Sequence, residues 1–201
     1  AWLDLVEVYE AALRVRSRGG NEAAMLIQIA MILWRKVEDL DAAEGYFKRI
    51  KLNDPRNGLM LQFYSEYYAA REDYKRLLST LSTRQSIEPK PEGKVRLGLE
   101  MAEVAEHRLG NKEKAIDVWK SVLKIDDVHA EARQSLRRLF RETRKWNALL
   151  EFLKEDLKRL PEDDLAGQVA AHLQMIAIYR DELRLPVMVV NTYNQILQID
   201  P

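Results

Sequence analysis

Three stretches of the chain share one pattern, in which an aromatic residue is followed by apolar residues at plus three, plus four and plus seven. The aromatic residues are Trp2, Tyr74 and Trp146, and each lies 72 positions from the next, at 2, 74 and 146. Apolar residues with these spacings share one face of an α-helix. Three copies in register are typical of an internal repeat. The sequence therefore predicts a stack of amphipathic helices.

The stretch from Glu131 to Pro161 contains one complete unit of this stack. Its first half places Leu136, Leu139 and Phe140 at helical spacing, and its second half begins at Trp146 after a polar turn. Two apolar stripes on either side of a tight turn indicate two helices that face each other. This predicts a helical hairpin as the repeating element.

Composition narrows the function classes. The 201 residues are 47% hydrophobic and 32% charged, and Lys+Arg equals Asp+Glu at 32 each, so net charge gives no reason to expect nucleic acid or an anionic membrane as partner. No cysteine is present, which removes disulfides and thiolate chemistry. No apolar run approaches the roughly 20 residues that span a bilayer. We expect a soluble fragment of a larger protein, in an unknown compartment with the cytoplasm favoured.

A known family motif is visible in two units. The third unit contains Leu109-Gly110-Asn111 before Ala115 and Trp119, and the first places Trp34, Ala43, Phe47 and Pro55 at positions eleven, twenty, twenty-four and thirty-two of a count from Ala24. This pattern resembles the tetratricopeptide repeat, a 34-residue helix-turn-helix, in a divergent array of bacterial type. The related half-a-tetratricopeptide repeat of RNA-processing scaffolds is the second choice, with the same fold.

The resemblance implies an all-α, right-handed superhelical solenoid of antiparallel helix pairs, with about eleven helices. We expect a single array over 1–201, in which 1–18 is the second helix of a truncated unit and the repeats are 21–55, 56–89, 90–127, 128–161 and 162–201. Units two and four lack the turn glycine of the motif, so a pair of units is an alternative period.

Every proline falls at a predicted helix boundary, as its helix-breaking cost of about 3 kcal/mol requires. Ser17 to Gly20 is predicted to end the first helix and Asn21 to cap the next. Trp2, Tyr74 and Trp146 are expected in the core between helices.

No catalytic constellation is found in the sequence. His107, His129 and His172 lie in different units, and none has a second metal ligand three or four residues away. No Gly-rich phosphate loop and no paired nucleophile and base are present. The sequence predicts a protein that is not an enzyme and that needs no cofactor or metal.

The resemblance also implies a binding groove lined by the first helix of each unit. Position five of successive units is occupied by Gln28, Gln62, Glu100, Gln134 and Gln174, and position nine of the fourth unit by Arg138. Repeated carboxamides can hydrogen-bond the main chain of a peptide with little regard for its sequence. The alternative is that glutamine is simply a good exposed helix former. We interpret these residues as a candidate peptide-binding groove.

A basic run gives a second candidate surface. Arg137, Arg141 and Arg144 share one helical face and form a candidate basic patch for phosphate or an acidic peptide. The alternative is a solvated face that nearby glutamates balance. The predicted function is a non-catalytic scaffold for a protein or peptide of unknown identity. An RNA-associated scaffold, or one that self-associates through exposed end helices, is the alternative.

Overall fold

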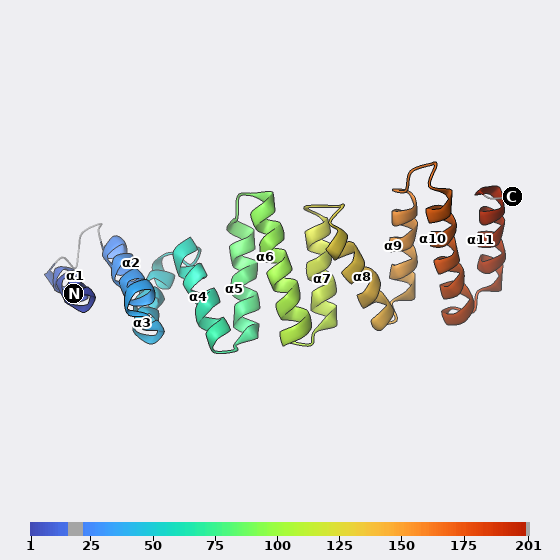
Figure 1. The fold of residues 1–201 in the computed structure, drawn as a ribbon. Helices are drawn as coiled ribbons and strands as arrows, with labels where there is room; N and C mark the ends of the chain where they lie inside the picture. The colour runs from blue at the N-terminus through green and yellow to red at the C-terminus, as the bar shows by residue number, and fades with distance from the viewer. Residues whose placement is uncertain (16–21, 200–201) are drawn as a thin grey trace. The chain divides into compact units, whose positions relative to one another are not determined.

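The computed structural model describes residues 1–15 and 22–199, and within these ranges all regular secondary structure is helical. The α-helices are α1 Trp2–Val15, α2 Glu22–Ile32, α3 Leu40–Asn53, α4 Gly58–Ala70, α5 Tyr74–Ile87, α6 Pro91–Glu103, α7 Lys112–Leu123, α8 Ala130–Glu142, α9 Trp146–Leu157, α10 Leu165–Ala177 and α11 Pro186–Ile199 (Figure 1). The expected all-α fold with eleven helices is confirmed for the described residues. The expected helix stop at Ser17 to Gly20 and the cap at Asn21 lie outside them.

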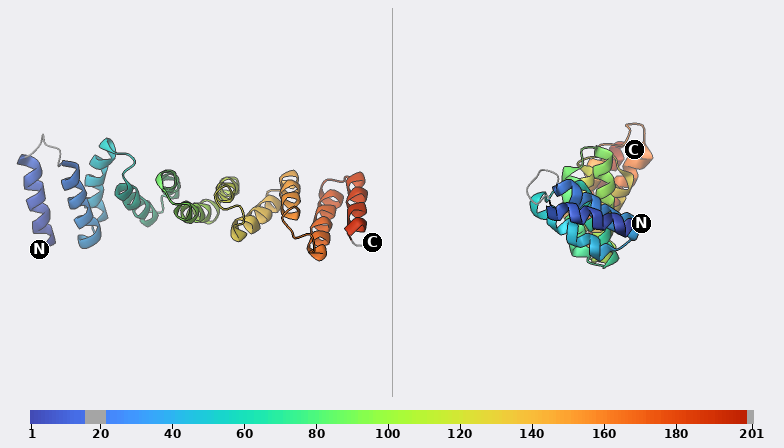
Figure 2. Two further views of the ribbon diagram at one scale, coloured as in Figure 1. Left: turned by 90° about the horizontal axis from the view of Figure 1, so that it is seen from above. Right: turned by 90° about the vertical axis from the view of Figure 1, so that its left-hand side faces the viewer.

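The chain divides into an N-terminal unit, Ala1–Ile125, and a C-terminal unit, Asp126–Pro201. In the first, α2 packs on α3, α4 on α5 and α6 on α7, and in the second α8 packs on α9 and α10 on α11. Successive hairpins within a unit are joined by contacts of α1 with α2, α3 with α4, α5 with α6, and α9 with α10. Figure 2 shows α1, α2 and α3 side by side. The predicted helical hairpins are confirmed, whereas a single array with a right-handed twist stays a prediction.

Each described hairpin turn contains one residue in the left-handed region of backbone space. These residues are Glu38, Glu72, Gly110, Arg144 and Arg184, with φ between 54° and 62°. In each turn the next residue donates its N–H to a carbonyl of the preceding helix, for example Asp73 to Tyr68 O at 2.9 Å. This arrangement satisfies carbonyls that a helix end would otherwise leave unpaired.

The turns alternate between two forms along the chain. The first helices of the first, third and fifth hairpins end in a π-helical turn, at Leu33–Val37, Val104–Arg108 and Ile178–Glu182. Their closing hydrogen bonds span six residues, as from Asp39 to Leu33, whereas those of the second and fourth hairpins span five, as from Lys145 to Phe140. The extra residue is accommodated by the π turn. This alternation supports a pair of hairpins as the structural period.

The second helices α3, α5 and α7 begin at short polar side chains that cap them. Asp39, Asp73 and Asn111 accept the backbone N–H three residues further on, at 2.9, 3.2 and 2.9 Å. Such caps satisfy N–H groups that the first helical turn leaves unpaired. Pro91 and Pro186 are the first residues of α6 and α11, where the missing N–H costs nothing.

Aromatic rings form the centre of the N-terminal unit. Trp34 lies edge-on to Phe47 and Phe63 at centroid distances of 5.8 and 5.5 Å, and the two phenylalanines stack at 4.3 Å. All three side chains are buried. Edge-to-face and stacked ring pairs stabilise a core beyond their buried area. The motif positions eleven and twenty-four, occupied by Trp34 and Phe47, are therefore core positions.

The expectation of a core position is wrong for Trp2, and Tyr74 and Trp146 lie at the margin of the core. Each is the first residue of its helix. Trp2 is 49% exposed, and Tyr74 and Trp146 are half-buried. The core is contacted by residues further along the same face, such as Val6 and Leu81, which are buried.

Candidate functional site

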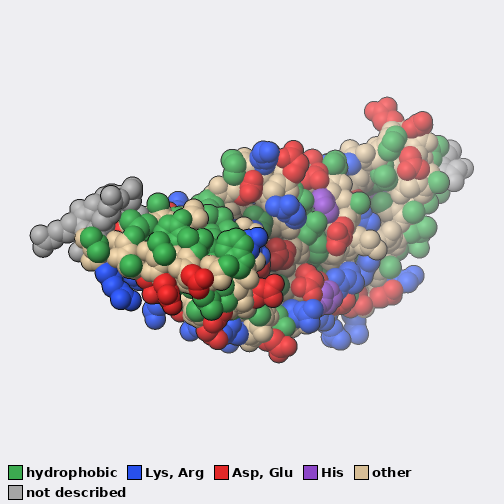
Figure 3. All heavy atoms as spheres, turned by 60° about the vertical axis from the view of Figure 1, so that its left-hand side comes forward, with side chains coloured by type: hydrophobic (Ala, Val, Ile, Leu, Met, Phe, Trp, Pro, Cys, Tyr) green, Lys and Arg blue, Asp and Glu red, His purple; other side chains and the backbone are tan. Residues whose placement is uncertain are grey.

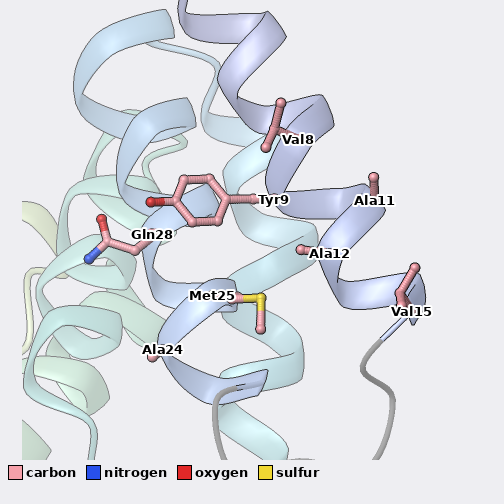
Figure 4. A pocket seen from close by; sticks show the side chains of 8 residues that line it. All are labelled: Val8, Tyr9, Ala11, Ala12, Val15, Ala24, Met25 and Gln28. Carbon is pink, nitrogen blue, oxygen red and sulfur yellow. The ribbon is translucent and has the colours of Figure 1, made fainter.

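A groove runs between α1 and α2 in the N-terminal unit (Figure 4). Its volume is about 730 Å³, and its lining side chains are Val8, Tyr9, Ala11, Ala12 and Val15 from α1 and Ala24, Met25 and Gln28 from α2. Tyr9 reaches from α1 toward α2, the helix that carries Gln28. One candidate residue from the sequence, Gln28, therefore lies in a concave site.

The groove is chemically simple. Among its described lining residues, the polar side-chain groups are the carboxamide of Gln28 and the hydroxyl of Tyr9, and the other side chains are apolar. Alanines at Ala11, Ala12 and Ala24 give it a shallow floor, over which the backbone of another segment can approach closely. An apolar groove with few polar groups is typical of a site that binds one face of a peptide.

Apolar side chains continue from the groove over the N-terminal face of the unit. Figure 3 shows hydrophobic atoms gathered there. On α1 the exposed large hydrophobic residues are Trp2, Leu3, Leu5, Val8 and Val15. Contiguous exposed apolar surface is uncommon on soluble domains and indicates an interaction site.

The other candidate groove residues of the N-terminal unit are Gln62 on α4, which is half-buried, and Glu100 on α6, which is exposed. Position twelve of the first repeat, Arg35, donates two hydrogen bonds of 3.0 Å to Glu66 at position nine of the next. A salt bridge thus joins the first helices of consecutive hairpins on this face.

In the C-terminal unit, an equivalent arginine contacts a candidate residue. Arg141, at position twelve of its repeat, donates to Gln174 Oε1 at 3.0 Å. Because the oxygen of Gln174 is engaged, its amide N–H₂ is the group available to another acceptor. Gln134 is exposed, and Arg138 pairs with Glu142 at 3.1 Å.

The three residues of the basic patch have different surroundings. Arg137 forms an ion pair of 2.9 Å with Asp156, a carboxylate that also accepts from Arg133 Nε at 2.8 Å. Arg141 is held by Gln174, and Arg144 is the left-handed residue of its turn, with φ of 54°. Two of the three guanidinium groups thus have partners within the unit.

The described residues contain no group of three or more His, Cys, Asp or Glu side chains that could hold a metal ion. His107 is exposed, and His129 caps α8 by accepting from Ala132 N at 3.3 Å. His172 is buried, with Nδ1 2.8 Å from Gln168 O. None of the described helices combines the length and apolarity needed to cross a membrane.

Sequence reasoning missed most of the α1–α2 groove. It used Trp2, Leu5, Val6 and Tyr9 to place the core face of α1, but Val8, Ala11, Ala12 and Val15 form a second apolar stripe with helical spacing. A helix with two apolar stripes has more apolar surface than one neighbour covers. This second stripe is the signal that could have predicted the groove.

The stacked hairpins carry the tetratricopeptide motif residues Trp34, Ala43 and Phe47 in buried positions. The fold is tetratricopeptide-like.

Solved structures similar to the chain include YrrB, a tetratricopeptide protein with an unusual peptide-binding site. It is 14% identical with a TM-score of 0.45, over 98% of this chain and 94% of that one. A tetratricopeptide repeat protein from Parabacteroides merdae is 14% identical with a TM-score of 0.49, over 100% and 74% of the two chains. Yeast Tom70 is 15% identical with a TM-score of 0.42, over 93% and 39%. No protein-family model matches the sequence, and no curated protein matches it.

Proposed function

We propose that this tetratricopeptide-like chain is a non-catalytic scaffold that binds a peptide segment of a partner protein in the α1–α2 groove. The observation that carries the proposal is the apolar groove of about 730 Å³, with Gln28 as one of the two polar residues in the described part of its lining. This volume lies within the range of roughly 300 to 1,000 Å³ that is usual for binding sites.

The groove chemistry favours a segment with one apolar face. The alanine floor admits close approach of a guest backbone, and Met25 can adapt its shape to different side chains. The Gln28 amide both donates and accepts, so it can pair with a main-chain N–H or C=O of the guest. An amphipathic helix, with anchors at positions i, i+3, i+4 and i+7, meets these requirements.

We further propose that the first-helix residues beyond the groove contribute polar contacts. They are Gln62 and Glu100 in the N-terminal unit, and Gln134, Arg138 and Gln174 in the C-terminal unit. The bond from Arg141 supports this role for Gln174, because it engages the amide oxygen and leaves the N–H₂ as the group for an outside acceptor.

The test uses two adjacent alanines on α2 as a matched pair. Peptides are selected from a random display library on the immobilised chain, and their dissociation constants are measured by fluorescence anisotropy. Ala24 lines the groove, whereas the neighbouring Ala23 is exposed and does not line it. Ala24→Arg should weaken binding at least about tenfold, because it places a charge in an apolar groove. Ala23→Arg should leave the affinity unchanged.

Equal effects of the two arginine substitutions would contradict groove binding. Gln28→Ala tests the polar contact separately, and an unchanged affinity would remove Gln28 from the site. A shift with RNA that weakens as salt rises, and that depends on Arg137 and Arg141, would favour the RNA-associated scaffold instead.

Self-association is a second candidate, which the exposed end helices favour. On α11 the exposed fractions of Val187, Val190 and Leu197 are 68%, 58% and 61%. Apolar area of this kind can be covered by a second copy of the chain. Light scattering over a range of concentrations should then show a rising mass that Val190→Glu abolishes. A constant mass would exclude self-association over the range measured.

A further inference from the structure

A second concavity, which we call the α9–α11 cavity, lies in the C-terminal unit. Its volume is about 450 Å³, and its lining residues come from α9, α10 and α11. The three helices lie next to one another, with α10 in contact with both others (Figure 1). No residue of the candidate groove or basic patch lines it. The cavity is therefore separate from the sites described above.

Its floor contains a buried hydrogen-bond acceptor. His172 is 5% exposed, and its Nδ1 lies 2.8 Å from the carbonyl oxygen of Gln168, to which an Nδ1–H donates. In a neutral imidazole this leaves Nε2 as an acceptor. Nε2 makes no hydrogen bond within the described residues, and His172 lines the cavity.

The repeat provides an equivalent site whose occupant is visible. The aromatic residue at position twenty-four is Phe47 on α3 and Tyr193 on α11, so the residues immediately before it, Tyr46 and Thr192, are equivalent. The helices α1 and α9 begin with Trp2 and Trp146. Eight residues further on, α1 has Glu10 and α9 has Lys154, so these two residues are also equivalent. We call the position between α1 and α3 the Tyr46 niche.

In the Tyr46 niche the chain supplies its own phenol. The Tyr46 hydroxyl donates to Glu10, and the space left there is about 230 Å³. Burial, and after it the hydrogen bond with Glu10, raise the pKa of Tyr46 to about 12, so the phenol is neutral at physiological pH. The first-helix residue equivalent to His172 is Leu26, which is buried and offers no hydrogen bond.

The third equivalent position, between α5 and α7, is closed by close packing of helices. There Gly98 replaces Leu26, and a Cβ on this glycine would lie 2.6 Å from Val122 Cγ2 and 3.1 Å from Gln85 Nε2. The same Gln85 amide donates to Lys94 O at 2.8 Å. Among the three equivalent positions, the α9–α11 cavity is thus the one with open space beside its second helix. The buried Tyr179 also lines this cavity, and its phenol bonds Lys154.

Thr192 leaves the cavity open because it is too short to fill it. Its hydroxyl donates to Met188 O at 2.7 Å, within its own helix, and its side chain is buried. Met175 and Met188 contribute thioethers to the lining. Sulfur of this kind packs favourably against aromatic rings.

The charges around the cavity favour a neutral guest. Two carboxylates, Glu151 and Glu155, and two ammonium groups, Lys154 and Lys158, lie on α9, and Lys154 is already bonded to Glu151 at 2.7 Å. An ionised guest would gain no net attraction from this set. An anionic guest would also be disfavoured by the lone pair of His172 Nε2, which offers it no hydrogen-bond donor. A ring with one hydroxyl donor meets each of these conditions.

We propose that the α9–α11 cavity binds the phenol ring of a tyrosine on a partner protein, in the position that Tyr46 fills in the N-terminal unit. The hydroxyl of the guest donates to His172 Nε2, and its ring packs on Met175 and Met188. This inference rests on the proposed function, which supplies the partner protein. It adds to that function the side chain that the partner inserts. The site is on another unit of the chain from the α1–α2 groove, so each can fail alone.

The test compares N-acetyl-tyrosinamide with N-acetyl-phenylalaninamide by NMR titration of the isotope-labelled chain. Tyrosinamide should shift the resonances of α10 and α11 that line the cavity, at roughly millimolar concentrations, as expected for a ligand of this size. Phenylalaninamide should bind about tenfold more weakly, because it leaves the His172 acceptor unpaired. No shift with tyrosinamide, or equal affinity for the two probes, would overturn the proposal.

Two variants separate the parts of the proposal. His172→Leu introduces the residue type of the equivalent position, Leu26, and removes the acceptor, so both probes should still bind but with equal affinity. Thr192→Tyr fills the cavity and should abolish binding of both, whereas Asn194→Tyr, on an exposed position of the same helix that does not line the cavity, should not. Retained binding in Thr192→Tyr would contradict the assignment. If the mass of the chain rises with concentration and Thr192→Tyr abolishes this rise, the cavity binds a second copy of this chain. That result would contradict the proposal that a different protein supplies the tyrosine.

Discussion

The indole Nε1 of Trp34 donates a hydrogen bond of 3.0 Å to the Glu66 carboxylate, which Arg35 also holds through two bonds of 3.0 Å. Trp34 is only 4% exposed and belongs to the first hairpin, whereas Glu66 belongs to the second. The carboxylate therefore satisfies a buried donor across a hairpin boundary. Stacking of neighbouring hairpins is what stabilises an array of this type.

Removal of this carboxylate should destabilise the N-terminal unit more than removal of its cation. Glu66→Ala leaves the buried Trp34 N–H unpaired, and we expect a loss of about 2 kcal/mol in the free energy of unfolding. Arg35→Ala removes a surface ion pair and a cation–π contact 3.4 Å from the Trp34 ring centroid, and it should cost about 1 kcal/mol. Urea unfolding followed by circular dichroism measures both. An Arg35→Ala cost equal to or above that of Glu66→Ala would contradict the role of the indole bond.

Tyr46 predicts a pH dependence at the alkaline end. Burial and then Glu10 raise its pKa from 10.0 to about 12, so the folded chain retains a proton that the unfolded chain loses. The contribution of Tyr46 to stability is therefore complete below about pH 10 and is lost as pH rises toward 12. Urea unfolding at about pH 9 and about pH 11 should show a larger loss of stability for the wild type than for Tyr46→Phe. Equal losses would show that Tyr46 ionises alike in both states.

The backbone of Arg144 is in a strained, left-handed conformation in the turn between α8 and α9. Its φ is 54°, a conformation that costs residues other than glycine roughly 1 kcal/mol. Gly110 occupies the same place in the third hairpin, with φ of 60°. Arg144→Gly should therefore stabilise the C-terminal unit by up to about 1 kcal/mol. Arg144→Ala, which removes the same charge but keeps the strain, is the control, and an equal gain in both variants would contradict the backbone explanation.

Periodicity predicted the fold well because hairpin stacking makes strong demands on spacing. Phe47 and Trp119, at the aromatic position of the motif, are buried as such stacking requires. The exposure of Trp2 was not predictable from the same pattern, because an aromatic residue at the first position of a helix fits the stripe without reaching the core. The π turns also escaped prediction, since one inserted residue leaves the apolar spacing on either side unchanged.

The candidate sites were harder to predict because they depend on which surfaces remain uncovered. Gln28 was found through its repeat position, and it lines a groove, but the alanines that make the groove shallow look like ordinary helix formers in the sequence. The α9–α11 cavity arises from one short residue, Thr192, where an equivalent helix has Tyr46. Comparison of the second helices with one another, rather than with a family motif, is the signal that identifies it.

The central claim is that the α1–α2 groove holds a peptide of a partner protein. Hydrogen–deuterium exchange of the full chain, with and without a peptide selected from the display library, tests it most directly. The account predicts slower exchange of backbone amides in α1 and α2 on peptide binding. Protection confined to helices other than α1 and α2 would contradict it.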